Sequence, residues 1–433
     1  MLLVIFIDLA GFSIIFPLFP AMLDYYLARE GPDSVIGHLA GFLNSFSRTG
    51  ESTRFLTAVL FGGILGSLYS LLQFISSPFW GRLSDRYGRR RILLFTATGT
   101  ALSYFLWMFS GAFILLLIAR ALGGLMAGNI AVATAAVADL SSKEQRSRSM
   151  ALVGLAFGLG FVVGPAIGGF STLLAPEFFA ESKAAIGFHP FTVAAAFAFL
   201  LSLINLIWLY TRFPETLSER DLAMARANPM PPSWLPRTAN PAVRHTSRLY
   251  FIILLAFSGM EFTLTFLAVE RLFYDPAEMV KVFLFVGFCL ALAQGFIVRR
   301  FIRRTGEIPM AMSGILCAFL GLILLASAHA PLIFYAGLAA LAIGIGLTSP
   351  TLTALVSLYS SATEQGHNLG VFRAYGALAR AAGPLSCALL YWYYGSSTAY
   401  LAGAAILISS MGLALVLPKP HIPADAEGPK TGV

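Results

Sequence analysis

The sequence predicts an all-α, polytopic membrane protein, and three observations indicate this class. Apolar runs of about 20 residues recur along the chain, the length a helix needs to cross a hydrocarbon core of about 30 Å. Of the 433 residues, 58% are hydrophobic and only 12% are charged, about half the usual charged share of a soluble protein. Lys and Arg gather between the runs, so we interpret the net charge of +8 as topology and expect no nucleic-acid partner.

Six apolar runs fill the first half of the chain. The first, Leu2 to about Leu27, carries Asp8, Pro17 and Pro20 and lacks a basic leader, so we expect no cleaved signal peptide. The polar segment that follows, Ala28–Arg54, is long for a connection, and the sequence leaves its structure open. The other five runs lie at about Thr57–Phe79, Ile92–Ser110, Ala112–Ala138, Ser149–Leu174 and Phe191–Tyr210.

A proline-rich polar segment, residues 212–247, divides the chain because its composition cannot build a core. Within it, Thr216–Arg226 is expected to form a short interfacial helix, since Thr216 and Glu219 have capping-box spacing. Six further apolar runs follow, near Leu249–Phe273, Val280–Val298, Ile308–Ala328, Leu332–Leu358, Leu369–Tyr394 and Ala399–Leu417.

Charge asymmetry orients these runs. Loops on one side carry 20 Lys and Arg residues, and loops on the other side carry six. Because positive loops stay inside, we expect a plasma (inner) membrane protein with both termini in the cytoplasm. The expected domains are an N-terminal six-helix bundle (1–211), a cytoplasmic linker (212–247), a C-terminal six-helix bundle (248–418) and a cytoplasmic tail (419–433).

The loop between the second and third runs, Gly81–Arg91, reads GRLSDRYGRRR. Its glycines let helix ends approach a neighbouring backbone, its aspartate can accept from helix N-termini, and its arginines fix orientation. The spacing G-x-x-x-D-R-x-G-R-R resembles the signature loop of the major facilitator superfamily, a large family of secondary transporters. A loop that merely anchors at lipid headgroups is the alternative. The residues assigned to this conformational loop and its acidic partner are Gly81, Asp85, Arg86, Gly88, Arg89, Arg90 and Asp139.

That resemblance implies twelve transmembrane helices, arranged as two six-helix bundles with inverted repeats around a central cavity. The two halves of the chain echo each other accordingly. Gln73–Arg91 aligns in position with Gln294–Arg304, and Gly164-Pro165 with Gly383-Pro384. Pro214–Thr216 resembles the PET string at the exit of the sixth helix of the family, with a simple helix stop as the alternative.

The fifth run contains GLGFVVGPAIGG, whose glycines form a flat face for close helix packing and whose proline frees a carbonyl and bends the helix. The string resembles the motif of proton-coupled antiporters in the superfamily, which implies a seal and a hinge. A generic packing seam is the alternative. The residues assigned to the hinge or packing are Gly160, Gly164, Pro165, Gly168 and Gly169.

Charged residues within apolar runs are costly, so each is a functional candidate. Asp8, in DLAGFSIIFPLFP, resembles the first helix of drug antiporters, and Arg120, in LLIARALGGLMAGN, resembles the arginine of the fourth-helix motif of the family. Glu261 lies near the middle of the seventh run. We assign proton coupling to Asp8, Glu261 and Arg120. For Asp8, the alternative is a residue near the helix start that simply reaches water.

Arg373 and Arg380 share one face of the eleventh run. Residue counting places Glu261 and Arg380 at similar depths, about 20 Å from the cytoplasmic ends of their helices. We therefore expect them to pair or to share a substrate, with a permanent structural salt bridge as the alternative. The two arginines favour substrates with negative charge. The residues assigned to the substrate cavity are Arg373, Arg380, Gln73, Asn129 and Phe12.

Three longer strings, LFGGILGSLYSLLQF, FSGMEFTLTFLAVERLF and GALARAAGPL, resemble the tetracycline-transporter-like (TETRAN-type) proteins of animals, which are proposed to move organic anions and drugs. The tetracycline-resistance efflux pumps of bacteria are similar more distantly. The eighth run has no histidine, a departure from those pumps that argues against tetracycline itself.

The sequence therefore predicts a secondary active transporter, a proton-coupled antiporter that exports amphiphilic drugs and organic anions by alternating access. A lipid or lysolipid carrier, or a passive or symport facilitator of an organic anion, is the alternative. We find no Ser-His-Asp arrangement, metal-ligand cluster or nucleotide-binding loop in the sequence, so we expect no enzyme and no cofactor besides the proton. The expected partners are the lipid bilayer and a small amphiphilic substrate, and we expect a monomer.

Overall fold

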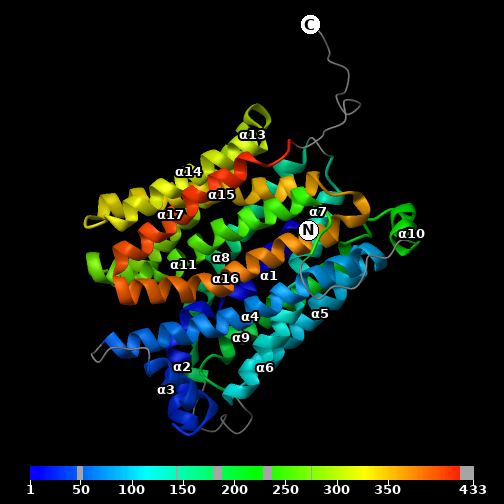
Figure 1. The fold of residues 1–433 in the computed structure, drawn as a ribbon. Coiled ribbons are helices and arrows are strands. Elements are labelled where there is room, and N and C mark those ends of the chain that lie inside the picture. Colours follow the sequence, from blue (N-terminus) through cyan, green and yellow to red (C-terminus); the bar gives the residue numbers. More distant parts are fainter. Residues whose placement is uncertain (46–51, 143–144, 179–187, 228–236, 275, 420–433) are drawn as a thin grey trace.

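The structure is a computed structural model, and it describes residues 1–45, 52–142, 145–178, 188–227, 237–274 and 276–419. Every regular element in these ranges is helical, as predicted (Figure 1). Residues 228–236 of the predicted linker and 420–433 of the predicted tail lie outside the described residues. The domain boundaries stay a prediction.

The helices follow the order of the predicted runs. Those of the first half are α1 (Leu2–Ser13), η1 (Phe16–Leu18), α2 (Phe19–Glu30), α3 (Val35–Ser45), α4 (Ser52–Tyr87), α5 (Arg89–Met108), α6 (Phe113–Met126), α7 (Asn129–Asp139), α8 (Arg146–Phe178) and α9 (Thr192–Arg212). Those of the linker and second half are α10 (Glu219–Ala227), α11 (Pro241–Leu272), α12 (Pro276–Leu292), η4 (Ala293–Val298), α13 (Arg299–Thr305), α14 (Glu307–Ala326), α15 (Pro331–Leu358), η5 (Ala362–Glu364), α16 (Gln365–Tyr394) and α17 (Ser396–Leu415).

Eight of the described helices are long and apolar enough to cross a membrane. A ninth candidate span lies at the beginning of the chain, where the arm Leu2–Leu18 and the arm Ala21–Glu30 meet at a bend of 64°. The short η1 at this bend contains Pro17, which has no backbone N–H to continue a helical ladder. With α4, α5 and α16, the described helices make twelve columns, as the sequence predicts.

Two connecting segments are helical in ways that the sequence analysis did not specify: the polar segment after the first run and the short helix of the linker. The open segment after the first run continues α2 to Glu30 and then forms α3. The predicted interfacial helix begins at Glu219 instead of Thr216. Ser218 caps it, because its Oγ accepts from Asp221 N at 3.1 Å, so the predicted capping box of Thr216 is wrong.

The two halves meet along α4 and α16, which run side by side (Figure 1). Small residues permit the close approach. A Cβ on Gly81 would lie 2.2 Å from the Gly366 carbonyl oxygen, and one on Gly370 would lie 2.6 Å from the Ser77 carbonyl oxygen. Ser67 Oγ also donates across the same contact to Ala381 O at 2.8 Å.

The glycine-rich face of α8 packs against α1. A Cβ on Gly164 would lie 2.0 Å from Ser13 Oγ, and one on Gly168 would lie 2.0 Å from Ile14 O. Ser13 Oγ donates to Gly160 O at 3.1 Å. A Cβ on Gly169 would meet nothing within 4 Å. The string thus includes a packing seam, while the hinge role of Pro165 and its neighbours stays a prediction.

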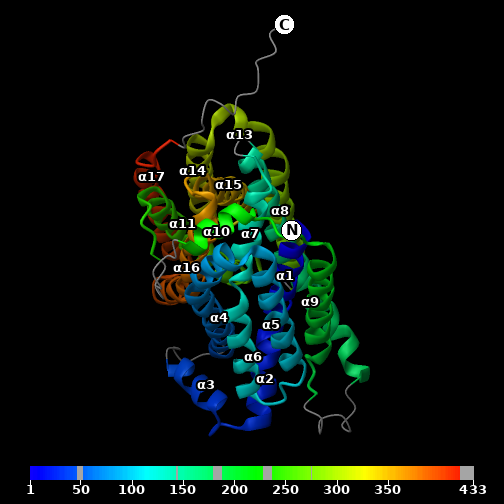
Figure 2. The same cartoon turned by 90° about the vertical axis from the view of Figure 1, so that its right-hand side faces the viewer.

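Polar groups mark the two ends of the molecule. We call the end that carries the Gly81–Arg91 loop the basic end; α10 and α13 lie there, whereas α3 lies at the opposite end (Figures 1 and 2). Between the ends, the cavity described next lies where the halves meet.

Candidate functional site

The centre of the molecule contains a small cavity between the two halves. Its free volume is about 10 Å³, room for about one water molecule. Its lining residues are Leu9, Phe12, Tyr69, Gln73, Ile130, Phe157, Phe161, Arg373 and Arg380. The first seven come from α1, α4, α7 and α8, and the two arginines come from α16. The molecule is therefore closed around an aromatic pocket with a cationic wall.

The two arginines of this wall bond only to uncharged groups among the described residues. Arg380 Nη2 donates to Gln73 Oε1 at 2.9 Å, and Gln73 Nε2 donates in turn to Ala127 O at 3.2 Å. The Arg373 guanidinium lies over the Phe157 ring at 4.5 Å, and its Nη2 is 3.5 Å from Thr134 Oγ1. Arg373 is buried and Arg380 is half-buried. Because a cation withdrawn from water without a counter-charge is costly, this wall is suited to an anion.

Arg120 lies behind the aromatic side of the cavity. It is 4% exposed, with its guanidinium 5.5 Å from the Phe12 ring centroid and 4.7 Å from the Tyr69 ring centroid. Within the described residues, its Nε and Nη2 have no hydrogen-bond partner. Cation–π contacts with two lining rings therefore couple this buried cation to the cavity.

Asp8 is held by two asparagines. Asn129 Nδ2 donates to its Oδ2 at 2.5 Å, and Asn205 Nδ2 donates to its Oδ1 at 2.7 Å. The break between α6 and α7 places Asn129 at the first position of α7, beside α1. No cation lies within ion-pair distance of Asp8 among the described residues. This carboxylate is oriented by neutral donors and lies one helical turn from Phe12 of the cavity.

Glu261 does not pair directly with Arg380, although the sequence allowed that interpretation. The structure shows no ion pair between them, because Arg380 is bonded to Gln73 across the interface. Glu261 is exposed on α11, and Arg380 is the charge that acts on it. The other expectation, that the two residues share a substrate, stays a prediction.

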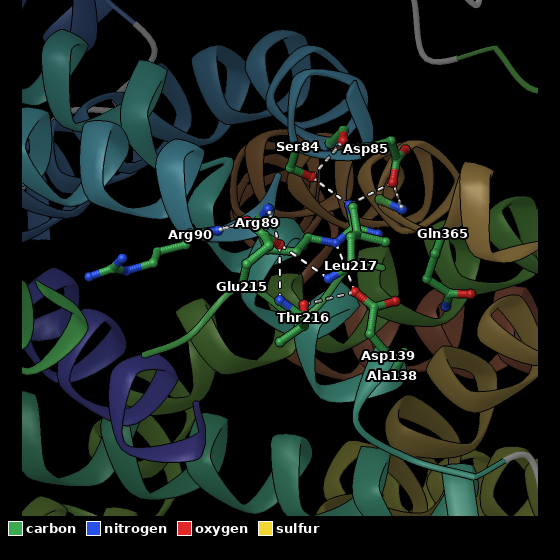
Figure 3. A network of polar contacts seen from close by, with 12 residues as sticks. Ser84, Asp85, Arg89, Arg90, Ala138, Asp139, Glu215, Thr216, Leu217 and Gln365 are labelled. Carbon is green, nitrogen blue, oxygen red and sulfur yellow. Dashed lines mark hydrogen bonds and ion pairs between the residues drawn. The ribbon is translucent and has the colours of Figure 1, made fainter. Parts of the chain in front are cut away.

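At the basic end, Arg89 is the centre of a network of polar contacts (Figure 3). Its Nη1 donates to Asp85 Oδ1 at 2.6 Å, and its Nε donates to Asp139 Oδ2 at 2.9 Å. Arg89 is fully buried. The predicted acidic partner Asp139 thus contacts the loop arginine as the family resemblance implied.

Asp85 extends this network into the second half. Its two carboxylate oxygens accept from Gly366 N at 2.9 Å and from His367 N at 2.7 Å, in the first turn of α16. A carboxylate at a helix N-terminus is stabilised by the unpaired N–H groups and by the helix dipole. Asp85 therefore ties the end of α4 to the beginning of α16.

Glu215, from the string that follows α9, caps the beginning of α5. Its carboxylate accepts from Arg89 N at 2.9 Å and from Arg90 N at 3.1 Å (Figure 3). Gly88 precedes these residues with φ +99°, and a Cβ there would lie 2.3 Å from Glu215 Oε2. Both the backbone conformation and the space require glycine. The exposed Arg86 instead lies over the Tyr87 ring.

A second polar cluster closes the opposite end of the first half. Tyr26 Oη donates to Ser110 O at 2.6 Å. His189, 1% exposed, lies with Nε2 2.8 Å from Trp107 O, while its Nδ1 accepts from Phe191 N at 3.2 Å. These bonds fit a neutral imidazole with its proton on Nε2. Burial lowers the pKa of His189 to about 4.

Sequence reasoning missed several residues of the centre, and three of them contact its charged side chains. Asn205 is the second donor to Asp8, and Tyr69 and Phe157 lie under the guanidinium groups. Asn205 could have been found as a polar residue inside an apolar run. Tyr69 and Phe157 could not have been selected from the sequence, because the chain has 37 Phe and 15 Tyr and only packing decides which of these rings reach the guanidinium groups.

Similarity to known proteins agrees with this architecture. The Major Facilitator Superfamily profile matches residues 1–384. Major facilitator superfamily domain-containing protein 10 of Bos taurus is 32% identical over 97% of this chain and 92% of its own length. The class B tetracycline resistance protein of Escherichia coli is 26% identical over 90% of this chain and 87% of its own length.

Solved structures extend the likeness to three dimensions. The crystal structure of the human organic anion transporter MFSD10 (TETRAN) superimposes with a TM-score of 0.81 at 30% identity, over 95% of this chain and 97% of that one. FucP in its outward conformation, at 15% identity and a TM-score of 0.65 over 96% of this chain and 98% of that one, shares the fold. The chain belongs to the major facilitator superfamily.

Proposed function

We propose that the protein is a proton-coupled antiporter that exports amphiphilic organic anions by alternating access. As a member of its superfamily it is an integral membrane transporter and not an enzyme. The observation that carries the proposal is the cationic wall of the aromatic cavity, since Arg373 and Arg380 have no carboxylate partner among the described residues. The similar human protein is described as an organic anion transporter, which agrees with this substrate class.

In this proposal an amphiphilic anion binds with its charged group at the two arginines and its apolar body against the rings. Guanidinium groups donate strong, charge-assisted hydrogen bonds to carboxylate or sulfonate oxygens. Phe12, Phe161 and the Tyr69 ring would supply the apolar contacts. The free volume of about 10 Å³ cannot hold such a molecule, so the halves must separate to admit it.

Asp8 is the proposed proton carrier. Its two asparagine donors orient the carboxylate without neutralising it, so it can gain a proton when its surroundings open to one side. Glu261, on which the charge of Arg380 acts, is the second candidate. Export of an anion against entry of a proton moves positive charge inward in both steps. A membrane potential that is negative inside would therefore drive the cycle together with the pH gradient.

Alternating access requires a contact that closes one side and can be released. The Asp85 bonds to the first turn of α16 join the halves at the basic end. We expect both termini in the cytoplasm from the charge asymmetry, and in that orientation this contact closes the cytoplasmic side. Its release would then open the cavity inward for loading of the exported anion.

The test is transport by purified protein in proteoliposomes that hold an inward or outward pH gradient. The substrates are a fluorescent organic anion, a cationic dye and a fluorescent lysolipid. Wild type is compared with Asp8→Asn, Glu261→Gln and Arg380→Ala, and the matched control is Asp33→Asn, which alters an exposed carboxylate. We expect gradient-driven anion flux that Asp8→Asn or Glu261→Gln abolishes and Asp33→Asn preserves.

Flux that ignores the gradient and survives both carboxylate substitutions would refute proton antiport. Movement of the lysolipid without the anion would replace the anion proposal by a lipid carrier. Transport of the cationic dye alone would show that the arginines do not select the substrate.

A further inference from the structure

The eighth column of helices is interrupted by a π-helical segment, η4, directly after α12. A π-helical turn inserts an extra residue into the helix and redirects the side chains around it, and such turns occur frequently at functional sites. The second residue of η4 is Gln294. Neither the loop motif nor the proposed function uses this residue.

Gln294 is buried without a hydrogen bond to its oxygen. The side chain is 4% exposed, and its Oε1 has no partner among the described residues. A buried acceptor without a partner costs free energy, and native structures contain few of them. An apolar side chain would therefore suit this closed conformation better, which indicates that the amide serves another state of the protein.

The amide lies on a cradle of glycines contributed by both halves. A Cβ on Gly154 of α8 would lie 3.1 Å from the amide carbon and oxygen, and one on Gly158 would lie 3.9 Å from the oxygen. In its own half, a Cβ on Gly346 would lie 3.6 Å from Gln294 Cγ. Because α8 belongs to the first half, separating the halves there uncovers the free oxygen.

The cradle adjoins the central cavity. Phe157, between the two α8 glycines in the sequence, lines the cavity and supports the Arg373 guanidinium at 4.5 Å. Gln73 of α4 also lines the cavity and bonds to Arg380. The first half thus places Gln73 in the cavity wall, bonded to Arg380. The second half places Gln294 against the α8 segment that carries Phe157, with its oxygen unbonded within the described residues.

We propose that Gln294 is a specificity-determining contact of the transported substrate, whose side-chain oxygen accepts a hydrogen bond from a hydroxyl or N–H group of the anion. This inference rests on the proposed anion transport. It narrows the substrate class to amphiphilic anions that carry a hydrogen-bond donor on the apolar body, away from the charged group at Arg373 and Arg380. Hydroxylated aromatic acids and amide-linked aromatic acids have this chemistry.

The test uses matched substrates in the proteoliposome assay. The probes are 2-naphthoate and a series of hydroxy-2-naphthoates that differ only in the position of the hydroxyl group. For wild type, we expect the KM of the best hydroxylated isomer to be roughly tenfold lower than that of 2-naphthoate, the value of one good hydrogen bond. In Gln294→Met, which keeps the length and removes the amide, this KM ratio falls to about one.

A second variant and a stability measurement distinguish a role of Gln294 in substrate specificity from a purely structural role. Gln73→Met, which releases Arg380, is expected to raise the KM of both kinds of substrate and to keep their ratio. Gln294→Met should unfold at an equal or higher temperature than wild type, because it removes an unpaired buried acceptor. A lower unfolding temperature with an unchanged KM ratio would make Gln294 a structural residue and overturn the inference.

The wild-type protein alone also decides the question. Transport of every naphthoate with the same KM would overturn the Gln294 inference and leave anion transport standing. Absence of transport for the naphthoates and for the fluorescent organic anion, with the cationic dye or the lysolipid moved, would refute the proposed function and this inference with it.

Discussion

The centre of the molecule and its basic end use the same charged side chains in opposite ways. At the basic end, Arg89 is buried between Asp85 and Asp139 in direct ion pairs. At the centre, Arg373 and Arg380 contact rings and neutral groups, and no carboxylate lies within ion-pair distance among the described residues. Arg89 and Arg373 are both buried, so exposure to water does not explain the difference between them, while Arg380 is half-buried.

The difference indicates which charges serve the fold and which serve a substrate. A paired buried arginine holds two carboxylates in place, and its removal leaves two buried negative charges without a counter-charge. An unpaired buried arginine costs free energy that a bound anion can recover. Substitutions in the two regions should therefore affect different properties, stability at the basic end and transport at the centre.

The largest expected effect comes from Arg89→Gln. This change leaves Asp85 and Asp139 buried without their cation, and breaking such pairs costs about 3–5 kcal/mol. Unfolding of the detergent-solubilised protein by heat or denaturant measures the loss. Arg86→Gln, which changes an exposed arginine of the same loop, is the control and should alter stability by less than about 0.5 kcal/mol. Equal losses in both variants would contradict the comparison.

Arg380→Met should mainly reduce transport, whereas Arg89→Gln should mainly reduce stability. Loss of a charge-assisted contact with the anion is worth about 1.5–3 kcal/mol, so we expect anion flux at low substrate concentration to fall roughly 10- to 100-fold. Stability should fall by no more than about 1–3 kcal/mol, since no ion pair is lost and only the buried Gln73 oxygen loses its donor. Flux and unfolding temperature are measured on the same preparation. A fall in stability as large as that of Arg89→Gln would show that Arg380 also serves the fold.

A third substitution tests whether the packing contact between α1 and α8, beside the central cavity, is rigid. Gly168→Ala places a Cβ 2.0 Å from the Ile14 carbonyl oxygen, and overpacking of this kind costs about 1–3 kcal/mol. Gly169→Ala is a matched control, since a Cβ there meets nothing within 4 Å. We expect only Gly168→Ala to lower the unfolding temperature. Equal behaviour of the two variants would mean that α1 and α8 adjust freely.

The smallest effect should come from lowering the pH, because acid protonates the buried His189 and leaves its positive charge without a partner. The pKa of His189 is about 4 in the folded protein and about 6.5 when unfolded. Its neutral form therefore stabilises the fold fully above pH 6.5, and this stability is lost as the pH falls toward 4. At pH 5 the loss is about 2 kcal/mol. His189→Gln should lack this part of the pH dependence when unfolding is compared at pH 7.5 and pH 5; an unchanged profile would contradict it.

Sequence reasoning grouped Asp85 and Arg89 because a motif with fixed spacing carries them, and it named Asp139 as the acidic partner from the family resemblance. The structure brings the three side chains into contact, while their role in the conformational change stays a prediction. It placed Glu261 and Arg380 at a common depth, since residue counting gives position along a helix axis. Counting does not give the direction in which each side chain points around that axis relative to a neighbouring helix. Arg380 therefore bonds to Gln73 across the interface, a partner that depth alone could not select.

The sequence by itself determined the number and order of the helical columns, because hydrophobic length and charge between runs are local properties. It also marked the buried charges, since each is conspicuous within an apolar run. Only the tertiary structure decided which of those charges are paired and which asparagines hold Asp8. It also decided that the side-chain oxygen of Gln294 lies against Gly154 without a hydrogen-bond partner among the described residues. These features depend on contacts between distant helices, which packing fixes and local sequence does not.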